Sequence, residues 1–102
     1  MRWQFASCVL DAERYVLLRD GEPQALEPQA LDVLAHLVRN RGRVVTRDEL
    51  LDAVWGTRFV SEAALTTRIR DARSAVGDDG ARQDVIRTVR GRGYELVAEV
   101  LE

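Results

Sequence analysis

Two helical patterns separated by a very short connection constrain the fold of this chain most. The first begins at Thr46, which stands three residues before Glu49 in the spacing of a capping box, and ends at Gly56. The second has Ser61 as a candidate cap and Gly77 as a stop. Its apolar residues recur at i, i+4, i+7 and i+11, and they are Leu65, Ile69, Ala72 and Val76. Two helices joined by so few residues are typical of a helix-turn-helix.

The sequence before this pair predicts a small sheet and a first helix. Residues 3–26 contain short apolar or alternating pieces separated by polar turns, which favours antiparallel strands. These pieces are WQF, CVLD, RYVLLRDGEP and QAL. From Pro28 to about Arg41 the apolar residues follow a helical spacing, and Gly42 is a suitable stop.

The sequence after the pair predicts a loop and a hairpin. The segment GDDGARQD lacks the ligand spacing of a calcium loop and is interpreted as a solvated turn. In the hairpin, Tyr94, Leu96 and Ala98 alternate on one face, whereas Ile86 and Val89 lie three apart, which allows a bulge. The expected organisation is one domain over residues 1–102. It comprises a sheet at 3–26, a three-helix core at 28–77 and a hairpin at 85–98.

Residue content excludes several classes of function. The single cysteine, Cys8, cannot form an intrachain disulfide and is predicted to be a small buried hydrophobe. The single histidine, His36, falls opposite the apolar stripe of its segment and is predicted to be solvated. No metal site, cofactor or nucleophile–base pair is expected, so the chain is predicted not to be an enzyme. It has no apolar run of about 20 residues and no signal peptide, which favours a cytoplasmic domain without membrane contact.

The charge distribution favours a nucleic-acid partner despite a net charge of −2. All 15 basic residues are arginine, whose planar fork suits phosphates and guanine edges. Residues 58–94 carry an excess of arginine over acidic residues, whereas the rest of the chain is acidic. The basic charge is therefore concentrated on the second helix of the pair and on the hairpin.

The second helix of the pair, at about 62–76, has a polar face opposite its apolar stripe. At about 100° per residue this face consists of Ala63, Thr67, Arg70 and Ser74, flanked by Thr66 and Asp71. Small side chains with one long arginine fit the major groove of DNA. Arg68 and Arg73 lie on the two shoulders, where phosphates would run.

The hairpin tip adds a second basic element. Gly91 and Gly93 permit a tight turn that approaches a duplex closely, and Arg90 and Arg92 can then reach a phosphate or a minor groove.

The order of these elements and two specific segments resemble a known family. The segments RGRVVTRDELLDAVWG and IRTVRGRGYEL are similar to those of the winged-helix DNA-binding domain of OmpR/PhoB-type bacterial transcription regulators, and the resemblance extends over about Phe5 to Ala98. It implies an α+β winged helix-turn-helix with an N-terminal antiparallel sheet, three helices and a C-terminal β-hairpin wing. It also implies transcription regulation by sequence-specific binding to double-stranded promoter DNA.

The resemblance assigns roles to particular residues. The recognition helix at about 62–76 would enter the major groove, and the wing at 90–93 would reach the adjacent minor groove. The residues facing bases or the groove would be Thr66, Thr67, Arg70 and Asp71, to which the helix geometry adds Ser74. The residues near phosphates would be Arg68, Arg73, Thr88, Arg90 and Gly91, with Arg92 at a position that varies in the family. The connection from Gly56 to Val60 matches a loop that contacts RNA polymerase in some members, which concerns Thr57, Arg58 and Phe59.

The resemblance also sets expectations about assembly. Members often bind as head-to-tail dimers on direct repeats, and the free domain is expected to be monomeric because no long apolar heptad is present. In members with a phosphoacceptor domain, that domain precedes this module, and this sequence contains no such domain. We therefore expect either an excised C-terminal domain or the N-terminal part of a longer protein, as in membrane-tethered relatives. Of these two alternatives we favour the second.

Some residues depart from the family pattern. Glu27 precedes Pro28 where a threonine is usual, which predicts a weaker helix cap. Asp71 stands where many relatives carry a basic residue. It either accepts from cytosine N4 or pairs with Arg68 at i,i+3, and the second interpretation is favoured. The alternative function is a winged-helix protein-interaction module without DNA binding, which the acidic net charge and Asp71 support.

Overall fold

The N-terminal part of the chain is a four-stranded antiparallel meander with strands in sequential order. In this computed structural model, which describes residues 1–102, the strands are β1 (Arg2–Phe5), β2 (Cys8–Asp11), β3 (Val16–Arg19) and β4 (Glu22–Pro23). Asp20 and Gly21 both have positive φ and form the two-residue turn between β3 and β4. The segment Gln24–Leu26, which was predicted to be a strand, is irregular and leads directly into the first helix.

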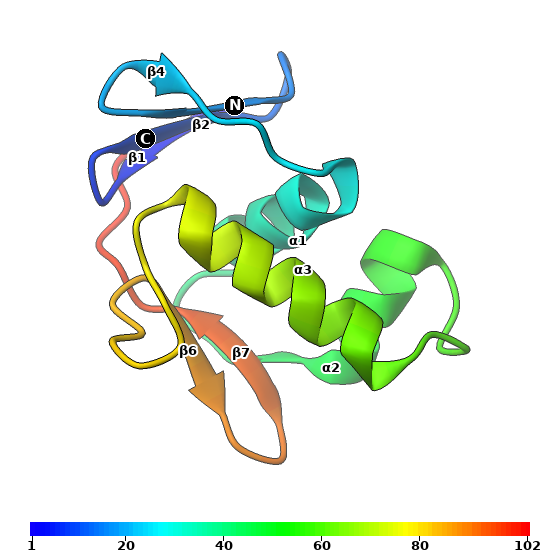
Figure 1. Cartoon of the computed structure of the whole chain (residues 1–102). Coiled ribbons are helices and arrows are strands. Elements are labelled where there is room, and N and C mark those ends of the chain that lie inside the picture. Colours follow the sequence, from blue (N-terminus) through cyan, green and yellow to red (C-terminus); the bar gives the residue numbers. More distant parts are fainter.

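Three helical segments lie between this meander and the C-terminal hairpin (Figure 1). They are α1 (Pro28–Arg39), the short α2 (Arg47–Leu50), which continues as the π-helical turn η1 (Leu51–Trp55), and α3 (Glu62–Ala75). The change to π geometry within the second helix was not predicted. It is visible at Gly56, whose N–H donates to the carbonyl of Leu51 five residues earlier.

Both ends of α1 are capped by side chains. Glu27 accepts hydrogen bonds from the N–H groups of Gln29 and Ala30, so this residue caps the helix although a threonine is usual there. The helix ends two residues earlier than predicted because the amide of Asn40 donates to the carbonyl of His36 and satisfies the last turn.

The second sheet combines the hairpin with a strand that the sequence did not predict. β6 (Ile86–Val89) and β7 (Gly93–Leu96) form the wing, and β5 (Val45–Thr46) pairs with β7 on its other side, giving the order β5-β7-β6. The β6–β7 register is continuous from Ile86 opposite Leu96 to Val89 opposite Gly93. The bulge allowed by the spacing of Ile86 and Val89 is therefore absent, since the two residues simply lie on opposite faces of β6.

The hydrophobic core joins the two sheets through α1 and α3. Its fully buried side chains come from every layer, and the largest are Trp3, Leu10, Leu17, Leu34, Leu37, Leu50, Leu51, Leu65, Ile69 and Ile86. Each such leucine contributes roughly 1.5–3 kcal/mol by leaving water. Cys8 is buried among them, as predicted, and burial raises the pKa of its thiol. The predicted α+β class with three helices and a terminal hairpin is confirmed.

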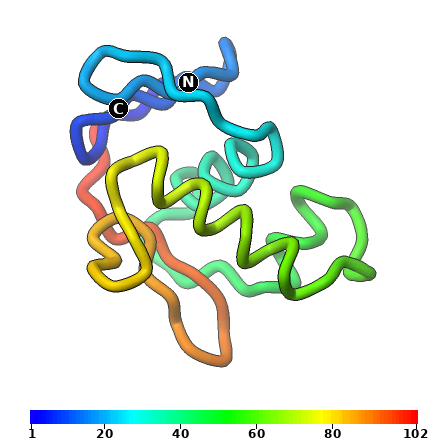
Figure 2. The backbone as a smooth tube through the Cα atoms, in the orientation of Figure 1, coloured from blue at the N-terminus to red at the C-terminus, as the bar shows by residue number.

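The two termini meet at the meander. Leu101 forms an isolated antiparallel bridge with Gln4, in which both residues exchange backbone hydrogen bonds. The backbone trace shows the last residues returning from the wing to β1, so both ends lie at the same end of the molecule (Figure 2). The wing tip lies at the opposite end (Figure 1).

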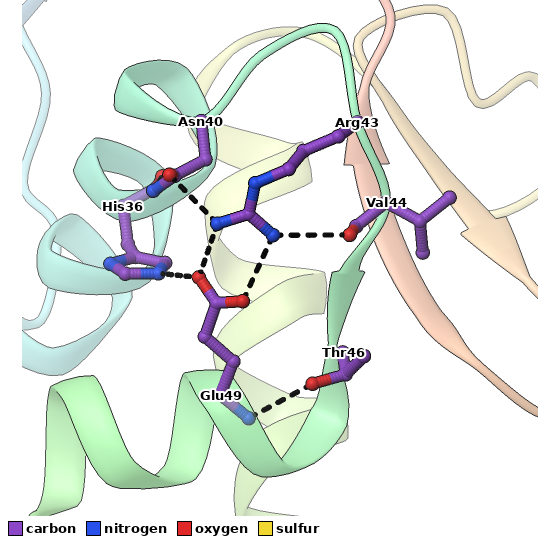
Figure 3. Close-up of polar contacts among 6 residues, drawn as sticks. All are labelled: His36, Asn40, Arg43, Val44, Thr46 and Glu49. Atoms are coloured by element: carbon purple, nitrogen blue, oxygen red, sulfur yellow. Dashed lines mark hydrogen bonds and ion pairs between the residues drawn. The ribbon is translucent and has the colours of Figure 1, made fainter.

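A charged cluster fixes α2 against α1 (Figure 3). The carboxylate of Glu49 accepts two hydrogen bonds from the guanidinium of Arg43, at 2.8 and 2.9 Å, and lies 2.7 Å from Nε2 of His36. The hydrogen bonds from Arg43, reinforced by His36, lower the pKa of Glu49 to about 2. His36 is therefore half-buried and hydrogen-bonded, and the prediction of a solvated histidine was wrong because Glu49 lies on another element.

The same cluster explains why the predicted capping box is only half formed. The hydroxyl of Thr46 accepts from the N–H of Glu49, as expected. The carboxylate of Glu49 does not return to Thr46, because Arg43 and His36 bind it instead.

Candidate nucleic-acid interface

Helix α3 presents the polar face that its sequence predicts. Ser61 caps the helix by accepting from the N–H of Ala64 at 3.1 Å. The stripe of Leu65, Ile69, Ala72 and Val76 is buried to at least 97%. On the other side Thr66, Arg70 and Ser74 are exposed, while Thr67 and Asp71 are half-buried.

The arginines of α3 have three different environments. Arg70 makes no hydrogen bond or ion pair and extends freely from the polar face. Arg68 pairs with Asp71 at 2.9 Å and lies 3.4 Å from the carboxylate of Glu27, so the interpretation of Asp71 as an i,i+3 partner is confirmed. The ion pair with Asp71 neutralises the positive charge of Arg68, which was expected to face a phosphate.

Arg73 requires a correction. It was predicted on the exposed shoulder, near phosphates, but it is only 9% exposed. Its guanidinium turns toward the wing and donates to the carbonyl of Ile86 and to the hydroxyl of Thr88. Arg73 lies four residues after Ile69, at the edge of the buried stripe, and this spacing was the signal in the sequence for its burial.

The loop between α3 and β6 also differs from the prediction of a solvated turn. Asp78 is only 5% exposed, and its carboxylate accepts from the N–H groups of Asp84, Val85 and Ile86 at 2.9–3.1 Å. Burial raises the pKa of Asp78, but these backbone hydrogen bonds together outweigh it and hold the pKa below its usual value. The buried carboxylate of Asp78 thus fixes the end of the loop, and the exposed carboxylate of Asp79 accepts from the N–H groups of Ala81 and Arg82 within it.

The wing tip is formed by Arg90, Gly91 and Arg92. Both arginine side chains are exposed and have no hydrogen-bond or ion-pair partner, and Gly91 has φ +74°, a left-handed turn conformation. Gly93 was predicted to allow close approach to a duplex, but its role is internal. A Cβ atom at Gly93 would lie 2.0 Å from the carbonyl oxygen of Val45, so only glycine lets β5 pair with β7.

Most arginines of the chain have a partner within the protein. They bind carboxylates or carbonyls, or, in Arg39, stack on the ring of Trp3. The side chains without any such partner are Arg2, Arg70, Arg90 and Arg92. Three of these four belong to α3 and the wing tip, so the guanidinium groups that are free to bind gather there.

A groove separates α3 from the wing. It has a volume of about 660 Å³ and is lined on one side by Thr66, Arg70 and Ser74 and on the other by Thr88 and Tyr94. Three of the five groove-facing residues predicted on α3 therefore line it, whereas Thr67 and Asp71 do not. Thr88 is already bonded to Arg73.

The connection between η1 and α3 contains the most exposed aromatic side chain. Phe59 is 99% exposed, and its N–H donates to the hydroxyl of Thr57. Arg58 binds the carboxylate of Asp52 through two nitrogens, and this hydrogen bonding raises the pKa of Arg58.

No group of three histidine, cysteine, aspartate or glutamate residues lies close enough to hold a metal ion. None of the helices is long and apolar enough to cross a membrane.

Comparison with known proteins places the chain among transcription regulators. Residues 21–96 match the family model described as transcriptional regulatory protein, C terminal. The chain is 41% identical over 88 residues to the sensory transduction protein RegX3 of Mycolicibacterium smegmatis. That alignment covers 85% of this chain but only 39% of RegX3, so the chain spans about two fifths of the length of this curated relative.

Solved structures agree with this placement. The DNA-binding domain of Klebsiella pneumoniae RstA, in complex with the RstA box, superposes with a TM-score of 0.84 at 26% identity, covering 94% of this chain and 96% of that one. The DNA-binding domain of Escherichia coli CadC gives a TM-score of 0.81 at 30% identity, with coverage of 98% and 94%.

Proposed function

We propose that this chain, which belongs to the transcriptional regulatory protein C-terminal family, regulates transcription by binding a specific sequence of double-stranded promoter DNA. The family consists of DNA-binding domains of transcription factors rather than enzymes. The resemblance to OmpR/PhoB-type winged-helix domains is thereby confirmed. In our proposal α3 enters the major groove and the wing tip contacts the adjacent minor groove and its phosphates.

One observation carries this proposal: the unpartnered arginines of α3 and the wing tip. Arg70, Arg90 and Arg92 have no intramolecular acceptor, although acidic residues outnumber basic ones in the chain. An exposed, unpaired guanidinium is ready to bind a phosphate or a guanine edge without first breaking an ion pair. The solved complex of the RstA domain with its DNA box adds support from a relative.

The contacts of each side chain support a more specific proposal of residue roles. We assign Arg70, with Thr66, Thr67 and Ser74 around it, to base and groove contacts, and Arg90, Gly91 and Arg92 to phosphates or the minor groove. Arg68 and Asp71 neutralise each other and so contribute less charge to the surface. Arg73 and Thr88 bind each other, which leaves them little freedom to bind a phosphate.

Selection of bound duplexes from a random DNA pool tests the proposal. We expect one enriched sequence, which should then bind the chain at least about 1,000-fold more tightly than unrelated DNA at physiological salt. A mobility-shift titration on both duplexes measures this ratio. If no duplex is shifted even at low salt, the chain is instead a protein-interaction module.

We also propose that the connection carrying Thr57, Arg58 and Phe59 contacts RNA polymerase. An almost fully exposed phenylalanine next to an arginine held by Asp52 suits a protein partner better than water. Phe59→Ala in the full-length regulator should reduce activated transcription while operator binding stays unchanged. Arg2→Ala, which removes an exposed side chain elsewhere, is the matched control. Equal loss of binding and transcription would contradict a separate polymerase contact.

Assembly completes the proposal. The free domain should be monomeric, and two copies should bind head to tail only on adjacent half-sites of DNA. Light scattering of the free protein at micromolar concentration checks the first statement, and the stoichiometry on one and two half-sites checks the second. A stable dimer without DNA would contradict it.

A further inference from the structure

We propose that Arg73 is a positioning residue, which sets the distance between α3 and the wing instead of contacting DNA itself. This inference rests on the proposed function for its effect on DNA binding. The contribution of Arg73 to the arrangement of the wing, however, can be examined in the free protein without DNA.

The contacts of Arg73 use the forked shape of the guanidinium. Nε and Nη2 both donate to the carbonyl of Ile86, at 3.1 and 2.9 Å, and Nη2 also donates to the hydroxyl of Thr88 at 2.8 Å. Ile86 and Thr88 lie two residues apart and therefore on the same face of β6. One side chain of α3 thus binds two alternate residues of the first strand of the wing.

Asp78 binds the backbone N–H groups of the same short segment. Its Oδ2 accepts from the N–H groups of Val85 and Ile86, at 3.0 and 3.1 Å. A cation on α3 therefore binds the carbonyl of Ile86, while an anion just after α3 binds its N–H. Because both groups are buried, these charge-assisted hydrogen bonds are shielded from water and hold the start of β6 firmly.

The position of β6 decides where the wing tip lies. β6 pairs with β7 in a continuous register, so the tip with Arg90 and Arg92 moves with β6 as one hairpin. The groove between α3 and the wing is lined by Arg73 together with Arg70 and Thr88. A fixed spacing lets α3 and the wing tip bind adjacent grooves at once, without an entropic cost for ordering the wing.

The chemistry of lysine distinguishes positioning from a direct contact. A lysine at position 73 would keep the charge and would still bind a phosphate, but its single nitrogen cannot reproduce the three hydrogen bonds of the fork. We therefore compare Arg73→Lys with Arg2→Lys, which changes an exposed arginine of the meander, in titrations of the duplex recovered from the random pool. Arg2→Lys should bind within about twofold of the native chain, whereas Arg73→Lys should bind about tenfold more weakly.

Two further measurements identify the mechanism. In the free protein, Arg73→Lys should speed amide exchange in Arg87–Val89, because β6 is less firmly held. In the Arg73→Lys background, Arg90→Ala should cost much less affinity than in the native chain, since a mobile wing no longer places Arg90 at the DNA. Thr88→Val removes the hydroxyl that accepts from Arg73 but keeps the β-branched shape, so it should also speed amide exchange in β6. This variant replaces Arg73→Lys in the exchange measurement if Arg73→Lys does not fold.

Clear results would overturn the proposal. If Arg73→Lys binds DNA within about twofold of the native chain, the residue acts as a simple positive charge. If DNA affinity falls while exchange in β6 is unchanged in both variants, Arg73 contacts DNA directly. Should the native chain bind no DNA at all, the proposed function fails, and the exchange measurement alone decides whether Arg73 holds the wing.

Discussion

At the scale of single residues, the structure distinguishes arginines that hold the fold from arginines that are free to bind. Arg43, Arg68 and Arg73 each have acceptors within 3 Å, and removing them would leave those acceptors unpaired. Arg70 has none. A charge count along the sequence treats these residues alike, although only the second kind can bind a ligand without loss to the protein itself.

Arg70→Ala tests the reading of sequence by α3. It should cost about 1–3 kcal/mol of binding free energy on the selected duplex and much less on unrelated DNA, because a base contact exists only with the correct base. Titrations on both duplexes measure the two values. Arg2→Ala, which removes the unpartnered arginine of the meander, should change neither. A common loss on both duplexes would mean that Arg70 binds only the backbone.

Glu49 predicts a pH dependence of stability. Its folded-state pKa of about 2 lies below the usual value of 4.5, so its stabilising effect is complete above about pH 4.5 and is lost as the pH falls toward 2. Glu49→Gln should therefore lower the free energy of unfolding at pH 7 and flatten its decline between pH 4.5 and 2. Urea unfolding at several pH values measures this, with Glu99→Gln, an exposed carboxylate without a partner, as control. Parallel curves for Glu49→Gln and the native chain would contradict it.

Predictions for single residues were correct where the physical cause lies within one helix or strand. The stripe from Leu65 to Val76 is enough to orient α3, because periodicity follows from helix geometry alone. The burial of Arg73 and Asp78 was missed because their acceptors and donors lie beyond a loop, in β6 and the two residues before it. The fate of His36 was missed for the same reason, since Glu49 reaches it from another helix.

At the scale of elements, contacts with the interior of the protein fix the position of the wing. β5 pairs with β7, and Arg73 of α3 binds β6. Helices α1 and α3 and the hairpin were predicted from periodicity, caps and alternation. The strand β5 was not predicted, because a segment of two residues shows no alternation of polar and apolar side chains. Its pairing with β7 depends on tertiary contact. The π turn η1 was missed because helical spacing over five residues does not distinguish the two helix types.

Gly93→Ala tests the junction of β5 and β7. The added methyl group would overlap the carbonyl oxygen of Val45 and force the strands apart, which should cost about 2–3 kcal/mol of folding free energy. Gly91→Ala is the matched control: it meets no neighbour and adds only the strain of a left-handed alanine, about 1 kcal/mol. Denaturant unfolding of both variants compares them. Equal losses would mean that the close approach of β5 at Gly93 is relieved at no cost.

At the scale of the whole molecule, the number of free arginines limits the electrostatic part of DNA binding. With Arg68 and Arg73 occupied internally, roughly two to three phosphates should be neutralised per chain, so log affinity should fall with log salt at a slope of about −2 to −3. Titrations of unrelated DNA at several salt concentrations give the slope. A value near −5 would require Arg68 and Arg73 to leave their partners when DNA binds.

The bridge between Gln4 and Leu101 makes the chain nearly a closed ring. Both termini lie at the meander, at the end of the molecule opposite the wing tip (Figure 1). A short linker between residues 102 and 1 would close the ring, and new ends could be opened in the exposed loop at residues 57–60. In such a circular permutant the recognition helix would start the chain and the second helix would end it, with the same surface facing the DNA.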